Sequence, residues 1–342
     1  MKHTEIETRQ QLANYLRCNI HFLEKAINNE FFIRDTKISE DVIPTISIPP
    51  SEITVSKYYI KKKGKNGGFR IVHHIWTYQL ENSLKILNNY LNEIFIPFDF
   101  IHGFVKGKNI KTNADTHLAK KIILSVDIEN YFESISKEMI ILGLCKIGFK
   151  EEIAESIASI VTINGFLPQG FCTSPTIANI VTHDLDQQLK KICGTNIQYT
   201  RYADDLYFSS DIENIPLLEI TKIIEIYGFI LNENKTKWMK RGQLQYVTGL
   251  TTFDSNTSRI SKKRKKNIRL EIYYLTKFGF RKHIKNKLIK SGENINAEDF
   301  EYKLIDEIDK TRNNLFGWLH FIKSIEPEFS AKYYSRLKKA KR

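Results

Sequence analysis

The stretch Tyr202-Ala203-Asp204-Asp205 places two adjacent carboxylates between two apolar, strand-like runs, residues 197–200 and 206–208. This pattern predicts a tight hairpin with both acids at its turn. Two neighbouring ionised carboxylates repel each other, so a turn between buried strands needs a counter-charge. A divalent cation fits, because hard oxygen ligands suit Mg²⁺, especially when substrate phosphates complete its shell. A solvated Asp-Asp pair in an ordinary hairpin is the alternative.

A third acid, Asp127, stands near the end of an almost wholly apolar run, residues 122–128. A lone acid at a strand end is most often a cap or a surface residue. Together with Asp204 and Asp205, however, it supplies the kind of carboxylate cluster that holds two metals for in-line phosphoryl transfer. In that mechanism one metal activates an attacking hydroxyl and the other stabilises the leaving pyrophosphate.

The composition is that of a globular protein. With 342 residues, 42% hydrophobic and 27% charged, the chain can bury a large core divided among several subdomains. We find no apolar run of membrane-spanning length and no signal peptide at the start, so we expect a cytoplasmic protein with no membrane partner. The cysteines have no CxxC spacing and favour reduced thiols over a zinc site or a disulfide framework; they are Cys18, Cys145, Cys172 and Cys193.

The positive charge is concentrated at one end. Residues 257–342 hold 23 Lys and Arg against 10 Asp and Glu, so this segment carries the whole net charge of +13. A neutral body with a basic C-terminal part suggests a catalytic core beside an element that grips a polyanion. Apolar residues such as Leu315, Trp318 and Leu319 predict that this part is a folded subdomain and not a solvated tail.

The remaining pattern mixes helices and strands without strict βαβ alternation, which predicts an α+β fold. Two strand-like runs around Asn66-Gly67 predict a hairpin over residues 58–72. Residues 36–55 are predicted to be an extended connector. Predicted helices cover residues 5–30, 77–94, 136–147, 150–163, 174–189 and 216–227, and predicted short strands cover 229–231, 237–240 and 245–250.

The strand ending near Asp127, the loop Leu167-Pro168-Gln169-Gly170 and the Tyr202-Ala203-Asp204-Asp205 turn, in this order, resemble motifs A, B and C of the reverse transcriptases. The resemblance covers roughly residues 56–325 and implies an RNA-directed DNA polymerase with two Mg²⁺ ions. Asp127, Asp204 and Asp205 would be catalytic, and with Ile128 they would form the metal site. The implied right-hand architecture has an N-terminal helical extension and connector (1–55), fingers (56–121), a palm (122–255, with part of the fingers inserted near 136–170) and a basic helical thumb (256–342).

Further positions take roles from the same resemblance. Phe132, five residues after Asp127, matches the steric gate that favours dNTPs over rNTPs. Gln169 and Gly170 would lie near the template and the incoming base, where glycine allows a close backbone approach. Arg70 matches the fingers residue that contacts the triphosphate. Lys235 matches the motif D lysine, a candidate proton donor to pyrophosphate.

Two shorter motifs resemble those of the bacterial retron reverse transcriptases. Residues 113–117 fit the NAxxH pattern through Asn113, Ala114 and His117. Val247-Thr248-Gly249 fits the VTG element that follows motif D. Each motif is short, and a buried structural histidine would explain His117 equally well, but both occur in the expected order.

The retron resemblance implies specific partners. Such an enzyme binds a structured noncoding RNA from its own locus (msr-msd), primes on a guanosine 2′-OH and uses dNTPs to make a branched RNA–DNA, msDNA. It commonly acts with an effector protein in anti-phage defence, and a host RNase H would have to remove the template RNA. We expect the cations at the start of the thumb to bind RNA phosphates; they are Lys262, Lys263, Arg264, Lys265, Lys266 and Arg269.

Two alternatives stay open. Another bacterial defence or group II intron-like reverse transcriptase would share the carboxylates but leave no 2′,5′ branch. A protein of a different class, an RNA-binding scaffold with a vestigial polymerase site, would bind RNA without making DNA. The three intact carboxylates argue against the scaffold.

Overall fold

The computed structural model describes residues 6–36, 53–62, 68–212 and 214–341, in which helices mix with three β-sheets. This confirms the predicted α+β class. The chain forms two compact units: unit 1 is Met1–Asn109 with Leu124–Trp238, and unit 2 is Ile110–Ile123 with Met239–Arg342. The boundaries of these two units differ from those predicted for the fingers, palm and thumb. The three subdomains therefore stay predictions. Within the described residues, no helix is both long and apolar enough to cross a bilayer.

The N-terminal helix predicted over residues 5–30 is two helices, α1 (Arg9–Tyr15) and α2 (Ile20–Ile27). The chain reverses between them at Arg17, whose φ is +56°. Asn19 then begins α2 as an N-cap, its side-chain oxygen accepting a 2.8 Å hydrogen bond from the His21 amide. The spacing of apolar residues predicts helix here correctly, but it does not reveal the short break between Tyr15 and Ile20.

A three-stranded sheet contains β1 (Phe31–Thr36), β2 (Ile53–Lys61) and β3 (Phe69–Ile75). β2 and β3 are antiparallel, with Ile60 opposite Arg70, so the two strands of the predicted hairpin are confirmed. Its Asn66-Gly67 turn lies outside the described residues. β1 runs parallel to β2 and was not predicted. The predicted connector over 36–55 is wrong at its last three residues, which start β2, and its stretch from 37 to 52 is not described.

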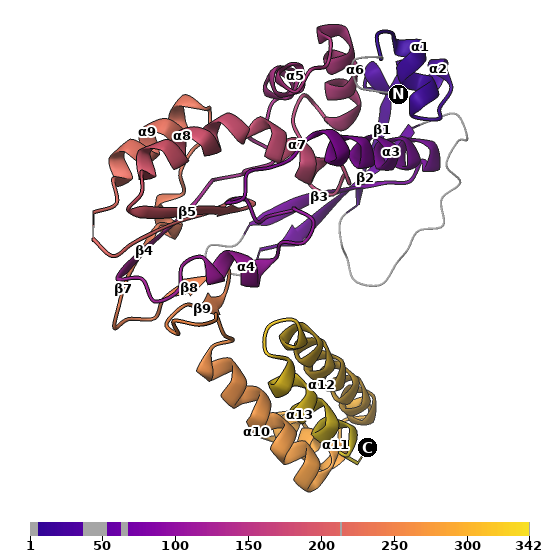
Figure 1. Ribbon diagram of the computed structural model, residues 1–342. Helices are drawn as coiled ribbons and strands as arrows, with labels where there is room; N and C mark the ends of the chain where they lie inside the picture. Colours follow the sequence, from indigo (N-terminus) through magenta and orange to yellow (C-terminus); the bar gives the residue numbers. More distant parts are fainter. Residues whose placement is uncertain (1–5, 37–52, 63–67, 213, 342) are drawn as a thin grey trace. The chain divides into compact units, whose positions relative to one another are not determined.

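A second sheet has the strand order β5-β6-β4-β7, and its strands are β4 (Ile122–Asp127), β5 (Ile197–Tyr202), β6 (Asp205–Ser210) and β7 (Lys237–Lys240). Apolar residues fill β4, so that it is buried along nearly its whole length. Helix α8 (His183–Cys193) packs on β5, and α9 (Leu217–Ile226) packs on α8 (Figure 1). This sheet brings the ends of β4, β5 and β6 together.

The other helices of unit 1 are α3 (Tyr78–Ile94), α5 (Lys137–Lys146), α6 (Glu151–Val161) and α7 (Ser174–Val181). The single helix predicted over 174–189 is therefore α7 followed by α8, interrupted at Thr182. Residues 229–231 form no strand; Leu231 makes only an isolated bridge with Ile128.

Unit 2 contains the short helix α4 (Ile110–Asp115), the paired strands β8 (Tyr246–Val247) and β9 (Leu250–Thr251), and the four helices α10 (Lys262–Phe278), α11 (Phe280–Lys290), α12 (Phe300–Lys323) and α13 (Pro327–Lys338). The helices pack on one another around buried residues such as Ile284, Phe300 and Leu304 (Figure 1). The predicted folded, basic C-terminal subdomain is confirmed.

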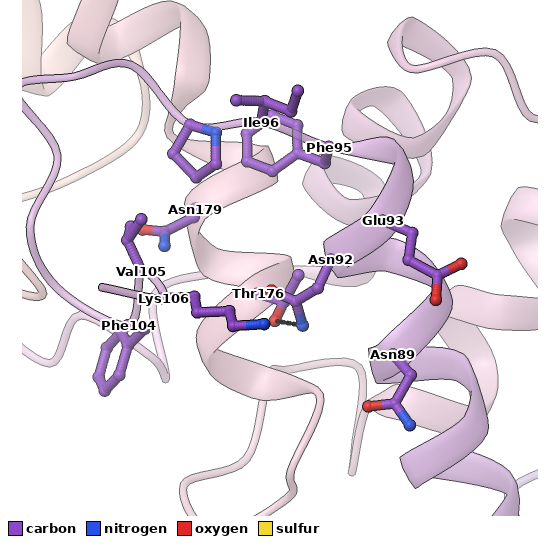
Figure 2. Close-up of a pocket in the computed structure, with 11 residues that line it drawn as sticks. Asn89, Asn92, Glu93, Phe95, Ile96, Phe104, Val105, Lys106, Thr176 and Asn179 are labelled. Atoms are coloured by element: carbon purple, nitrogen blue, oxygen red, sulfur yellow. Dashed lines mark hydrogen bonds between the residues drawn. The ribbon is translucent and has the colours of Figure 1, made fainter. Parts of the chain in front are cut away.

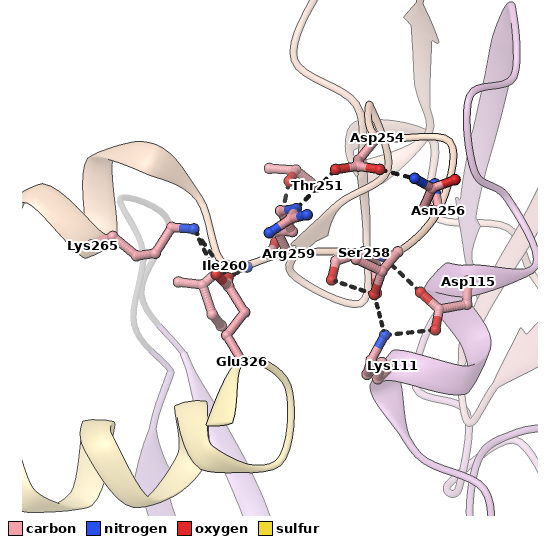
Figure 3. A network of polar contacts seen from close by, with 11 residues as sticks. Lys111, Asp115, Thr251, Asp254, Asn256, Ser258, Arg259, Ile260, Lys265 and Glu326 are labelled. Carbon is pink, nitrogen blue, oxygen red and sulfur yellow. Dashed lines mark hydrogen bonds and ion pairs between the residues drawn. The ribbon is translucent and has the colours of Figure 1, made fainter. Parts of the chain in front are cut away.

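Polar contacts hold the residues that precede α10 (Figure 3). Asp115 accepts hydrogen bonds from the Ser258 amide at 2.7 Å and from the Lys111 ammonium at 2.7 Å. Glu326 accepts from the Ile260 amide at 2.8 Å and pairs with Lys265 at 2.8 Å. The Ser258 contact joins the segment before α10 to α4, and the Glu326 contacts join the same segment and the start of α10 to the residue that precedes α13.

Candidate active site

The paired acids lie at the two-residue turn that joins β5 to β6, where Tyr202 is opposite Asp205 in the register. The turn uses a left-handed backbone at Ala203, with φ +57°. A left-handed conformation costs an L-residue about 1–2 kcal/mol, so the surrounding structure has to hold this turn in place.

A fully buried ion pair supplies much of that support. Arg201 and Asp186 are 0% and 1% exposed, and the Arg201 side chain donates to both Asp186 oxygens, at 2.8 and 2.6 Å. The same guanidinium donates to the Ala203 carbonyl at 3.2 Å and to the Tyr131 hydroxyl at 3.0 Å. Tyr199 donates a further 2.7 Å bond to Asp186. The residue immediately before the motif therefore ties the strained turn to helix α8.

A glycine permits another segment to approach the same turn. The His102 amide donates to the Arg201 carbonyl at 2.8 Å, and Gly103 follows. A Cβ at Gly103 would lie 2.3 Å from the Ala203 nitrogen, so only glycine fits without moving the backbone. The loop after α3 thus packs directly on the turn that bears Asp204 and Asp205.

The third acid is brought to the turn through backbone contacts. The Ile128 amide donates to the Asp204 carbonyl at 3.0 Å, which places the end of β4 against the turn. The Asp127 carbonyl accepts from the Asn232 amide at 2.8 Å. Asp127 is itself only 6% exposed. Asp127, which lies 77 positions before Asp204 in the sequence, is therefore its neighbour in the fold.

Their charges affect one another strongly. Burial, together with the charges of Asp204 and Asp127, raises the pKa of Asp205 to about 7. Burial and the charge of Asp127 also raise the pKa of Asp204, which Lys235 and Arg70 partly oppose. Such a crowd of carboxylates is poised to take up cations.

A lysine contacts one of these carboxylates directly. The Lys235 ammonium donates to both oxygens of Asp127, at 2.9 and 3.0 Å. Burial disfavours the lysine charge, but the hydrogen bond to Asp127 and the charges of all three acids outweigh this and raise its pKa. Lys235 is thus a protonated donor at the site, as the role of proton donor requires.

The acids fit a hard divalent ion by their chemistry, although within the described residues no three His, Cys, Asp or Glu side chains are already arranged around one point. The Lys235 ammonium is bound to both oxygens of Asp127, so this ion pair would have to separate before Asp127 could bind a metal ion. Carboxylate oxygens from β4 and from the turn are the donors that would then hold the ion.

The loop after α6 contacts the strand that bears Arg70. The His73 amide in β3 donates to the Gln169 carbonyl at 2.7 Å. Gly170 has φ +111°, and a Cβ there would lie 2.1 Å from the His73 carbonyl oxygen. The Ser174 hydroxyl reaches back to the Pro168 carbonyl at 2.6 Å. These contacts place the Gln169-Gly170 loop against β3, the strand that also contains Arg70. A nucleotide site shared by these three residues stays a prediction.

Phe132 is half-buried and lies 6.1 Å, between ring centroids, from Phe104. Phe104 also lines a cavity of about 590 Å³, with both polar and apolar walls, among α3, the loop after it and α7 (Figure 2). Asn92 donates to Thr176 across these helices at 3.1 Å, and Asn179 donates to the Gly103 carbonyl at 3.1 Å. The cavity wall is therefore linked to Gly103, the glycine that packs on the turn between β5 and β6.

The two short motifs lie together in unit 2. Asn113 and Ala114 are in α4, and His117 follows it; all three are fully buried. The Thr248 hydroxyl donates to the Ile110 carbonyl at 2.8 Å, so the Val247-Thr248-Gly249 turn contacts the start of α4. Neither side-chain polar atom of Asn113 has a hydrogen-bond partner among the described residues.

The basic cluster begins α10, where Ser261 is the N-cap. Its cations are exposed except Lys265, which is bound to Glu326 and only 17% exposed in its side chain. Lys265 therefore has a structural role. Arg264 lies beside an aromatic ring, that of Trp318. The freely accessible cations for the predicted RNA contact are Lys262, Lys263, Lys266 and Arg269.

Sequence reasoning missed Arg201, Asp186 and Gly103. Arg201 stands beside the motif, but its burial depends on Asp186 in a helix whose neighbours are polar, and no sequence pattern pairs these two residues. Gly103 could have been noticed as a glycine in an apolar context, since such a residue often marks a close backbone approach.

The family model described as "Reverse transcriptase (RNA-dependent DNA polymerase)" matches residues 60–252. The chain is 27% identical to the Retron Ec86 reverse transcriptase of Escherichia coli over 75% of this chain and 78% of that protein. It is 27% identical to the Retron Mx65 reverse transcriptase of Myxococcus xanthus over 80% of this chain and 62% of that protein. Among solved structures, the chain is similar to a telomerase from Candida albicans in complex with a fragment of telomeric RNA. The match covers 85% of this chain and 62% of the telomerase chain, with a TM-score of 0.44 and 12% identity, and is too distant to bear on function. The predicted resemblance to bacterial retron reverse transcriptases is thereby confirmed.

Proposed function

This chain belongs to the reverse transcriptase (RNA-dependent DNA polymerase) family, and from that premise we propose that it is a retron enzyme. It would bind its cognate noncoding RNA, prime on a guanosine 2′-OH and copy part of the RNA into branched msDNA, in anti-phage defence with an effector protein. The resemblance to several retron reverse transcriptases supports this reading. The chemistry is carried by one observation: Asp127 lies against Asp204 and Asp205 at the turn, and this crowding together with burial raises the pKa of Asp204 and of Asp205.

A polymerase of this family depends on divalent metal ions, and we propose two Mg²⁺ held by Asp127, Asp204, Asp205 and the backbone of Ile128. When bound, these ions would activate the attacking hydroxyl and stabilise charge on the phosphates. A carboxylate whose pKa is about 7 without metal would become fully ionised beside a divalent cation.

The remaining groups position and protonate the substrate. Arg70, whose charge acts on Asp204, would hold the triphosphate of a dNTP. Lys235, released from Asp127, would stay protonated and could donate a proton to the leaving pyrophosphate. Phe132 would lie under the sugar and exclude a ribose 2′-OH. Gln169 and Gly170 would shape the surface under the base.

The test is to express the gene together with the DNA upstream of it and extract small nucleic acids. We would treat them with RNase and with debranching enzyme and separate them on a denaturing gel. A discrete, debranching-sensitive single-stranded DNA is expected, and it should be absent from the Asp204→Ala/Asp205→Ala variant.

Other outcomes would change the assignment. DNA that requires the carboxylates but carries no branch would move the protein to another class of reverse transcriptase. DNA that survives the double substitution would contradict the active site itself.

A further inference from the structure

Helix α12 contains a glycine for which the fold offers no reason. Gly317 lies in the interior of Phe300–Lys323 and is exposed. Apart from its two chain neighbours and the nearby backbone of its own helix, a Cβ built there would meet no atom of the described chain within 4 Å, and the residue does not have a positive φ. Glycine destabilises a helix interior relative to alanine. A requirement for glycine at this position would therefore come from something that approaches the helix from outside.

Gly317 belongs to a stripe on one face of the helix. Asn314, Gly317, Trp318 and Phe321 have the spacing i, i+3, i+4, i+7 and together line an open cavity of about 310 Å³. The core of the helix bundle uses a different face, which carries Leu315, Leu319 and Ile322. The stripe is thus a largely apolar surface outside the core of the bundle, and its Phe321 is 40% exposed.

The surroundings of the stripe are cationic. The Arg264 guanidinium of α10 lies over the Trp318 ring, 4.1 Å from its centroid. Arg264 sits among the exposed cations Lys262, Lys263 and Lys266. Trp318 and Phe321 meet edge to face at 5.7 Å, so both rings are held in fixed orientations. A ligand at this surface would meet flat aromatic groups beside positive charge.

We propose that this face, called the Gly317 face, binds a single unpaired nucleobase of RNA. The base would stack on one ring of the Trp318–Phe321 pair and meet the other ring at its edge. The absent Cβ of Gly317 would let the base approach the helix, and its phosphate would face the cations of α10. Asn314 offers both a donor and an acceptor to the base edge. Apolar protein partners suit the rings but not the cations, whereas a nucleotide suits both. The proposal deepens the proposed function by naming how RNA is held outside the duplex.

The test compares two RNAs that need no knowledge of the cognate sequence. One is a blunt, fully paired RNA hairpin, and the other is the same hairpin with a single-stranded adenosine tail. The full-length wild-type protein should bind the tailed RNA more tightly. Because stacking on an aromatic side chain contributes measurably per base, this advantage should be roughly 5-fold to 100-fold.

Gly317→Ala separates the proposal from a structural explanation. It should raise the melting temperature of the protein, because alanine favours the helix, and yet remove most of the tail advantage without changing the affinity for the blunt hairpin. Asn313→Ala is the matched control, since it is an exposed neighbour that does not line the cavity. It should leave the tail advantage intact. Trp318→Leu keeps apolar bulk and should also remove the advantage.

Three results would overturn the proposal. The first is an unchanged tail advantage in Gly317→Ala. The second is an equal preference for a tail of abasic residues, which would mean that only the backbone is held. The third is a wild-type protein that binds neither RNA or shows no preference. Since both probes are generic RNAs, a protein that makes no branched DNA in cells could still pass this test.

Discussion

Two arginines in the molecule are used in opposite ways. Arg201 is fully buried, pairs with Asp186 and holds the backbone of the turn between β5 and β6. Arg264 is exposed at the start of α10, where its guanidinium lies over Trp318. The chemistry of the reaction needs groups fixed within a fraction of an ångström, which burial provides. Binding of a polyanion needs accessible cations, which burial would remove.

The largest expected effect is on stability. Arg201→Ala would leave the Asp186 carboxylate buried without its partner, which should lower the free energy of unfolding by about 3–5 kcal/mol. Arg264→Ala, at an exposed site, should change it by less than about 1 kcal/mol. Urea unfolding followed by circular dichroism measures both variants. Equal losses would show that burial does not distinguish these two arginines.

The next prediction concerns substrate choice in unit 1. Phe132→Ala should raise rNTP incorporation relative to dNTP by roughly 10-fold to 100-fold, because a clash in a substrate pocket contributes about 1–3 kcal/mol of discrimination. Single-nucleotide extension with matched dNTP and rNTP measures the ratio. Tyr302→Ala, an exposed aromatic in α12, serves as the control and should leave it unchanged. Unaltered discrimination in Phe132→Ala would remove its role as a gate.

A third prediction concerns the exposed cations. Replacing Lys262, Lys263 and Lys266 by Gln should lower the slope of log affinity against log salt by about 2–3, because each lost phosphate contact removes nearly one released counterion. Lys282→Gln/Lys285→Gln/Lys287→Gln in α11 is a comparison of equal charge. If the two triple variants behave alike, RNA binding depends on net charge and not on the start of α10.

The smallest effect should come from Asp205. Its folded-state pKa, about 7, lies above the usual value of 3.8, so its ionisation destabilises the metal-free fold as pH rises from about 4 through 7. Asp205→Asn should therefore be more stable than wild type by about 1–2 kcal/mol at pH 8 without metal, and this advantage should vanish near pH 4. Thermal melts with EDTA across this pH range check it. A variant less stable than wild type at pH 8 would contradict the crowding of the acids.

The sequence predicts the acids of the candidate site better than it predicts the buried residues that hold their turn in place. Asp127, Asp204 and Asp205 are recognisable because the motif residues must keep their order and their strand-and-turn context. The buried pair of Arg201 and Asp186 was missed because charged residues normally indicate surface, and only tertiary structure brings these two together.

The fold shows the same division. Apolar runs and turn residues predicted β4, the β5–β6 hairpin and the strands of the β2–β3 hairpin. The breaks near Arg17 and Thr182 were missed, since helical periodicity continues through both. Strand β1 was also missed, because its parallel pairing with β2 depends on a segment distant in sequence.

The most direct measurement takes two variants through the same two assays with the RNA transcribed from the DNA upstream of the gene. Asp204→Ala/Asp205→Ala should lose DNA synthesis by at least about 1,000-fold while it retains wild-type RNA affinity. The Lys262/Lys263/Lys266 variant should bind RNA more weakly yet reach a normal rate of synthesis at saturating RNA. DNA synthesis that survives loss of the two carboxylates, or RNA binding that disappears with them, would contradict the separation of catalysis from RNA binding on which this account rests.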